Sequence, residues 1–163
     1  MAAERRRRGF TLIEMVVVLA ILAVLASAAR PLLELAAVRQ REAALRDALR
    51  QLRNAIDAYA QAVADGQLPR PADAPKEGPV YPAALRVLVD GVPTATTPDA
   101  PRRHFLRRLP RDPFADPALP AELSWGQRAQ DSPPEMPRAG RDVFDVYSQS
   151  PRTALDGTRY RDW

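Results

Sequence analysis

The sequence predicts an α+β protein in which one long N-terminal helix crosses a membrane with its first half. Its second half is expected to pack against a small antiparallel sheet and a short helix. Two observations predict the helix: an apolar run at residues 10–29, and the fact that only Pro31 of 17 prolines precedes residue 69. The sheet is predicted by two β-branched and aromatic segments near the end of the chain, residues 122–130 and 142–150. With 163 residues, the chain has room for one domain besides this helix.

The apolar run is long enough to span a bilayer. It is interrupted only by Thr11, Glu14 and Ser27, and about 20 helical residues rise about 30 Å, the thickness of the hydrocarbon core. Four arginines directly precede the run and only Arg30 closes it. The positive-inside rule therefore predicts a cytoplasmic N-terminus, with the remaining chain on the other side of the membrane.

Glu14 is the most informative residue of this run. A carboxylate near hydrocarbon costs about 3 kcal/mol or more, so it needs a partner. Cleavage between Gly9 and Phe10 would create an α-amine on Phe10, about 6 Å of helix before Glu14. In a stack of parallel helices, the amine of one subunit could meet the carboxylate of the next, and Glu14 would set the register of assembly. Alternatively, Glu14 lies shallow enough to reach the interface or to stay protonated.

The segment GFTLIE, Gly9 to Glu14, stands between a basic leader and the apolar run. It resembles the leader junction of type IV pilins and of the pseudopilins of type II secretion systems. The resemblance implies cleavage after Gly9 by a prepilin peptidase with a cytoplasm-facing active site, N-methylation of Phe10, and retention of the apolar helix as a filament core. The expected parts are a cleaved leader (1–9), a transmembrane and filament-core helix (10–30), a periplasmic helix (31–66) and a C-terminal globular region (67–163).

A secretory signal peptide is the alternative for the N-terminus. Ala26, Ser27 and Ala28 form a small-x-small cleavage site after an apolar segment. The apolar run is long for a signal peptide, however, and a signal peptide has no use for Glu14.

The composition argues against nucleic-acid binding. The formal charge is +4, but residues 1–9 hold four arginines and one glutamate, and without them 20 basic and 19 acidic residues are left. The chain has no cysteine, so no disulfide framework supports the fold.

The segment from Leu32 to Asp65 predicts a second helical stretch, with Gly66 as the residue that ends it. Pro31 removes one helical hydrogen bond and favours a kink. One apolar stripe at helical spacing runs along the segment and consists of Val38, Leu45, Leu49, Leu52, Ile56, Tyr59 and Val63. The C-terminal region is expected to cover this stripe, although a free coiled coil would use the same spacing.

The C-terminal region predicts several short elements. Residues 81–91 form a short helix that starts at a proline and stops at Gly91. Residues 67–78 and 92–103 are loops, and Pro110, Asp112 and Pro113 build a turn. Residues 122–130 and 142–150 are strands joined by a proline-rich hairpin loop. The pattern does not decide whether Asp145 points inward or outward.

The order of these downstream segments resembles the major, G-type pseudopilin of type II secretion. The resemblance is carried by Tyr81 and Pro82, FLRRLPRDPF at 105–114, Trp125 and Gly126, DVFDVYS at 142–148, and Asp162 with Trp163. It implies a subunit that polymerises with itself and with minor pseudopilins on an assembly platform in the bacterial inner membrane, and so drives the export of folded proteins. A type IV pilin or a minor pseudopilin shares the leader, and a periplasmic binding module with a signal peptide or an anchor is the alternative of another class.

Typical members of that group also bind calcium in a loop near the C-terminus. The corresponding stretch here, residues 148–162, offers carboxylates only at Asp156 and Asp162, whereas calcium takes six to eight oxygens. Calcium is therefore one possibility. The other is that Asp156 and Gly157 form a turn and that Arg159 or Arg161 pairs with Asp162.

No catalytic function is expected. His104 is the only histidine, no serine, cysteine or carboxylate constellation surrounds it at a recognisable spacing, and zinc ligands are missing. No phosphate-binding GxxxxGK[ST] motif is present, so any energy for assembly must come from another protein.

Overall fold

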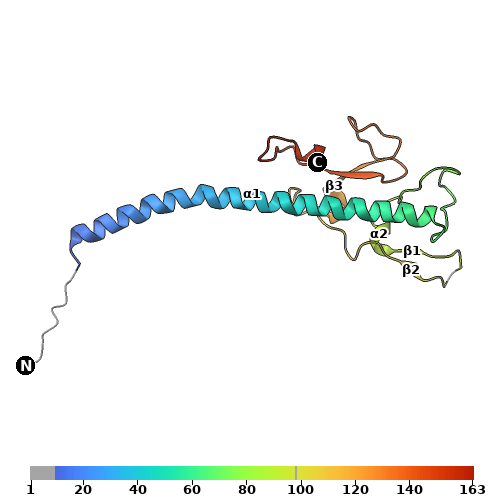
Figure 1. Cartoon of the computed structure of the whole chain (residues 1–163), viewed down its shortest axis with the longest axis horizontal. Helices are drawn as coiled ribbons and strands as arrows, with labels where there is room; N and C mark the ends of the chain where they lie inside the picture. The colour runs from blue at the N-terminus through green and yellow to red at the C-terminus, as the bar shows by residue number, and fades with distance from the viewer. Residues whose placement is uncertain (1–9, 98) are drawn as a thin grey trace, which may run out of the picture. The chain divides into compact units, whose positions relative to one another are not determined.

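The structure is a computed structural model that describes residues 10–97 and 99–163 (Figure 1). The predicted α+β class is confirmed. The elements follow the order α1 (Leu12–Ala64), α2 (Val87–Asp90), β1 (Val92–Pro93), β2 (Arg102–Arg103), η1 (Ala121–Ser124), β3 (Trp125–Arg128), β4 (Asp145–Ser148) and η2 (Tyr160–Asp162), where η denotes a 3-10 helix. The chain divides after Arg39 into two compact units, which are described separately.

The first unit contains the apolar part of α1. In the described chain, α1 is the one helix that is long and apolar enough to cross a membrane. The helix is continuous through Pro31. The predicted kink at Pro31 stays a prediction.

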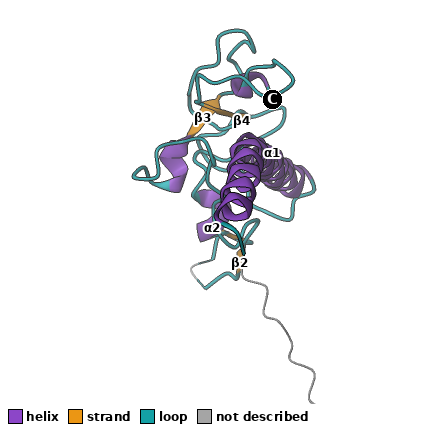
Figure 2. Ribbon diagram, turned by 90° about the vertical axis from the view of Figure 1, so that its left-hand side faces the viewer, coloured by secondary structure: helices purple, strands orange, loops and turns teal. Residues whose placement is uncertain are grey.

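The second unit is built around the C-terminal part of α1. Most of the predicted stripe is buried there, namely Leu45, Leu49, Leu52, Ile56, Tyr59 and Val63, whereas Val38 is half-buried. The covering side chains include Leu88 of α2, Trp125 of β3 and Val146 of β4. Figure 2 shows β3 and β4 next to one side of α1, and α2 and β2 next to another. Each large aliphatic side chain buried in this way stabilises the fold by about 1.5–3 kcal/mol.

Gly66 ends α1 as predicted. Its φ of 70° lies in the left-handed region, which glycine adopts without steric cost. The Gly66 N–H donates to Val63 O at 3.1 Å and the Gln67 N–H to Ala62 O at 2.9 Å, which satisfies carbonyls at the end of the helix.

Two predictions for residues 81–103 were wrong in part. The helix predicted over 81–91 is reduced to the four residues of α2, because the Pro82 carbonyl accepts a hydrogen bond from the Val143 N–H at 2.8 Å instead of starting a helix. The loop predicted over 92–103 contains the antiparallel pair β1–β2, with Val92 opposite Arg103. A ladder of two residues is too short to show an alternating pattern in the sequence.

The predicted hairpin is present as the antiparallel pair β3–β4. Trp125 lies opposite Ser148 and Arg128 opposite Asp145. Both strands are shorter than predicted. The first begins only at Trp125 because η1 takes up Ala121–Ser124, and the second is limited to Asp145–Ser148. Gly126 is required in this hairpin, since a Cβ atom there would lie 2.3 Å from the Tyr147 ring.

Candidate assembly site

The predicted assembly residues Phe10 and Glu14 lie at the start of α1: Glu14 is in its first turn, and Phe10 precedes the helix by two residues. Gly9 and the rest of the leader lie outside the described residues. Thr11 caps the helix, because its Oγ1 accepts a hydrogen bond from the Glu14 N–H at 3.3 Å. The spacing Thr-x-x-Glu is that of a capping box, and a carboxylate in the first turn is favoured by the helix dipole. The four residues from Thr11 to Glu14 therefore start the helix and place the Glu14 carboxylate about one turn after Phe10.

The side chains that follow present a continuous apolar surface. The large apolar side chains between Leu12 and Leu25 are exposed by between 44% (Met15) and 83% (Leu12). Within residues 10–97 and 99–163, no basic side chain lies within ion-pair distance of the Glu14 carboxylate. A helix with this surface needs lipid or other apolar helices around it.

The C-terminal stretch contains the two predicted metal ligands, and both carboxylates have protein partners. Asp156 Oδ1 accepts hydrogen bonds from the hydroxyl and the N–H of Thr158 at 2.6 and 3.0 Å. These bonds, the hydroxyl one first, hold the pKa of the Asp156 carboxyl below its ordinary value. Asp162 pairs with Arg159, with Nε 2.8 Å from Oδ2.

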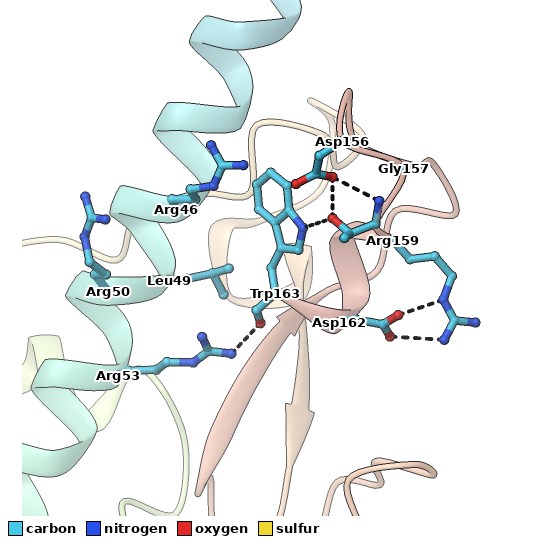
Figure 3. A pocket seen from close by; sticks show the side chains of 10 residues that line it. Arg46, Leu49, Arg50, Arg53, Asp156, Gly157, Arg159, Asp162 and Trp163 are labelled. Atoms are coloured by element: carbon cyan, nitrogen blue, oxygen red, sulfur yellow. Dashed lines mark hydrogen bonds and ion pairs between the residues drawn. The ribbon is translucent and has the colours of Figure 1, made fainter.

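The surroundings of these carboxylates are basic. Together with Arg159, three arginines of α1 (Arg46, Arg50 and Arg53) line an open cavity of about 650 Å³ beside Asp156 and Asp162 (Figure 3). In the described chain, no group of three or more His, Cys, Asp or Glu side chains is placed to share a metal ion. This donor set does not fit calcium, which takes six to eight oxygen ligands.

Two α1 residues that hold the C-terminal stretch were missed by the sequence analysis. Glu42 is buried, and its Oε1 accepts hydrogen bonds from the Leu155 N–H at 2.8 Å and the Tyr160 hydroxyl at 3.1 Å. Arg53 donates to Asp145. It also donates to the main-chain oxygen of Trp163 (Figure 3). Neither residue belongs to the apolar stripe, and their partners lie about a hundred residues further along the chain, so the local pattern gave no sign of these contacts.

Asp112 was predicted only as part of a turn, but it joins three segments. It is buried, and its Oδ1 accepts from the Phe114 N–H at 2.7 Å while its Oδ2 accepts from the Ser148 hydroxyl at 2.6 Å. Its own N–H donates to the Ser124 hydroxyl at 3.2 Å. The segment RDPF is therefore an anchor between the end of η1 and the end of β4.

His104 is placed as a structural residue. Its Nδ1 donates a hydrogen bond to the Val89 carbonyl at 2.8 Å, and the side chain is exposed. This position ties the segment after β2 to α2. That the chain has no catalytic function stays a prediction.

Comparison with known proteins gives one match. Residues 5–29 match the family model described as the prokaryotic N-terminal methylation motif. Searches of curated proteins and of solved structures found no match. The matched region contains the four arginines of the leader, the Gly9–Phe10 junction, Glu14 and the whole apolar run. The chain thus carries the leader of a substrate of a type IV pilin-like prepilin peptidase, which supports a place in the pilin-like family.

Proposed function

We propose that the chain is a structural subunit of the type II secretion pseudopilus, of the major or G type. One observation carries the proposal: a methylation-type leader runs into a helix with an exposed apolar surface and a carboxylate in its first turn. This combination suits a subunit whose helix is buried among other helices after processing.

The C-terminal half supports a secretion subunit over an adhesive pilin. It has no cysteine, so the disulfide-closed loop of a typical adhesive pilin is ruled out. The hairpin β3–β4 and the RDPF anchor occupy the segments that carried the resemblance to the G-type subunit.

In the proposed mechanism, the peptidase cuts after Gly9 and Phe10 becomes N-methylated. The new amine of one subunit then pairs with Glu14 of the next, and the desolvated ion pair sets the stagger between helices. Subunits enter from the inner membrane, where the N-terminus is cytoplasmic and the globular region periplasmic. An assembly platform and minor pseudopilins start the filament, and its growth moves folded proteins outward.

Deletion of the gene in the native cells tests this proposal. The expected result is loss of protein export with surface pili unchanged, restored by the wild-type chain. Loss of surface pili with export intact would instead assign the chain to the type IV pilins. Export and pili that both persist would contradict both assignments.

A further inference from the structure

Arg53 binds both ends of the C-terminal stretch. Its Nε donates to Asp145 Oδ1 at 2.8 Å, and its Nη2 donates to the main-chain oxygens of Val146 at 3.2 Å and Trp163 at 2.7 Å. Asp145 and Val146 precede the stretch 148–162, and Trp163 directly follows it. One cation on α1 therefore holds a carboxylate and two main-chain oxygens that come from opposite ends of the same segment.

These acceptors are of the kind that calcium takes, since calcium is bound by carboxylate and main-chain carbonyl oxygens. Asp145 has a second cation as well, because Arg128 Nη2 lies 3.4 Å from its Oδ2. The planar guanidinium presents several donors in a fixed arrangement and is always charged, so it can bind several oxygens at once.

A divalent ion would meet like charges in this region. A second cavity next to the one in Figure 3 is lined by Arg53, Arg128, Arg159 and Arg161, against Glu135, Asp145 and Asp162. To gain a carboxylate ligand, calcium would have to displace an arginine from Asp145 or Asp162. Repulsion from the displaced guanidinium would then oppose its binding.

Glu42 binds the middle of the stretch as a hydrogen-bond acceptor, whereas Arg53 binds its two ends as a donor. It lies about three helical turns before Arg53, so both side chains project from the same side of α1. Glu42 accepts hydrogen bonds from Leu155 and Tyr160, within the stretch, whereas Arg53 donates to its two ends. The helix thus provides an anion for the donors of the stretch and a cation for the acceptors around it.

We propose that the Arg53 guanidinium takes the structural place of calcium in this chain, so that the C-terminal stretch closes without a metal ion. The inference is independent of whether the chain polymerises. It predicts that this part of the molecule is equally ordered at every calcium concentration.

Limited trypsin digestion of the full chain in detergent micelles tests this inference. The stretch contains three trypsin sites of its own, Arg152, Arg159 and Arg161, and mass spectrometry of the released peptides reports their cleavage rates. Because calcium also stabilises trypsin, each rate is divided by the cleavage rate of a free peptide substrate in the same buffer. The corrected wild-type rates should be equal in excess calcium chloride and in excess EGTA. Arg53→Gln should raise the rates about tenfold, because the ends of the stretch lose their shared donor, and calcium should not restore them.

Arg50→Gln is the matched control, since Arg50 lies on the same helix, is exposed and, among residues 10–97 and 99–163, pairs only with Asp47. It should leave the rates unchanged. Arg53→Lys should give intermediate rates, because an ammonium keeps the charge but loses the planar fork. Three results would each overturn the inference. They are faster cleavage of the wild type in EGTA than in calcium, slower cleavage of Arg53→Gln in calcium than in EGTA, and cleavage of Arg53→Gln at the wild-type rate. Should Arg53→Gln fail to fold, Arg53→Lys takes its place in the test: rates above those of the wild type that calcium does not lower are expected, and rates equal to those of the wild type would overturn the inference.

Discussion

The carboxylate of Glu42 and the hydroxyl of Tyr160 are 118 positions apart in the sequence and form a buried hydrogen bond of 3.1 Å. This bond joins the long helix to the last turn of the chain. Tyr160 also stacks on Phe114, with ring centroids 4.1 Å apart, and meets Trp163 edge to face at 5.0 Å. The C-terminal segment is therefore held to α1 by a polar contact within an aromatic cluster.

Glu42→Ala is expected to destabilise the chain by about 2–4 kcal/mol, because it leaves the Leu155 N–H and the Tyr160 hydroxyl without their acceptor. Glu42→Gln should cost less, since an amide oxygen can still accept. Chemical denaturation followed by tryptophan fluorescence measures both. Glu34→Ala is the control, as Glu34 is exposed and pairs only with Arg30 in the described part of the chain, and its effect should stay below about 0.5 kcal/mol. An equal loss for Glu34→Ala and Glu42→Ala would contradict this role.

Alkaline pH is expected to unfold the chain through its tyrosines. Burial raises the pKa of Tyr160 above 10.0, and the hydrogen bond to Glu42 raises it further. Burial likewise raises the pKa values of Tyr59 and Tyr81. A raised pKa means that the folded state holds its proton longer than the unfolded state, so this contribution to stability is complete below pH 10 and is lost as the pH rises through the raised values.

The free energy of unfolding, measured between about pH 9 and 12, should therefore fall with increasing pH. Tyr160→Phe should lower the stability at neutral pH by about 1 kcal/mol, through the lost hydrogen bond, and should also weaken the alkaline decline. A decline of the same steepness in Tyr160→Phe would show that this phenol is not responsible.

Gly126→Ala should destabilise the β3–β4 hairpin by about 1–3 kcal/mol, because the new methyl group would displace the Tyr147 ring. A double-mutant cycle with Tyr147→Ala compares the cost of Gly126→Ala in the presence and in the absence of the ring, as measured by thermal unfolding. Without the ring, the same glycine substitution should cost little. A cost that persists in the Tyr147→Ala background would locate the constraint elsewhere.

The elements that could be predicted from the sequence are those with a local pattern, either a periodic spacing of apolar residues or a run of strand-forming residues. The stripe from Leu45 to Val63 has the period of a helix, and Gly66 follows it at the position where a helix ends. The two strand segments were found because Trp125 and Val146 lie in runs with β-forming composition, and their antiparallel pairing follows from the hairpin.

What the sequence could not show depends on contacts across long distances in the chain. Arg53 and Glu42 have the same spacing as any charged helix residue, and nothing near them indicates Asp145 or Tyr160. The shortening of α2 follows from a hydrogen bond between Pro82 and Val143, which local propensity does not report. Asp112 was assigned to a turn for the same reason, because its partner Ser148 belongs to β4.

Glu14→Ala is expected to leave membrane insertion and leader cleavage intact and to abolish filament assembly. The substitution keeps the main-chain N–H that Thr11 caps, so the start of the helix should persist while the carboxylate is lost. Shearing and sedimentation of filaments from cells that overproduce the chain measures assembly, with Glu34→Ala as the control carboxylate. Filaments of wild-type yield from Glu14→Ala would refute its role in setting the register.

The proposed assembly depends most on the creation of an amine at Phe10, and mass spectrometry of the chain purified from its native membranes tests this directly. The expected N-terminus is an N-methylated Phe10, and Gly9→Val should leave the precursor uncut in the membrane. A chain that begins near Ala29, or one that keeps residues 1–9, would contradict the account.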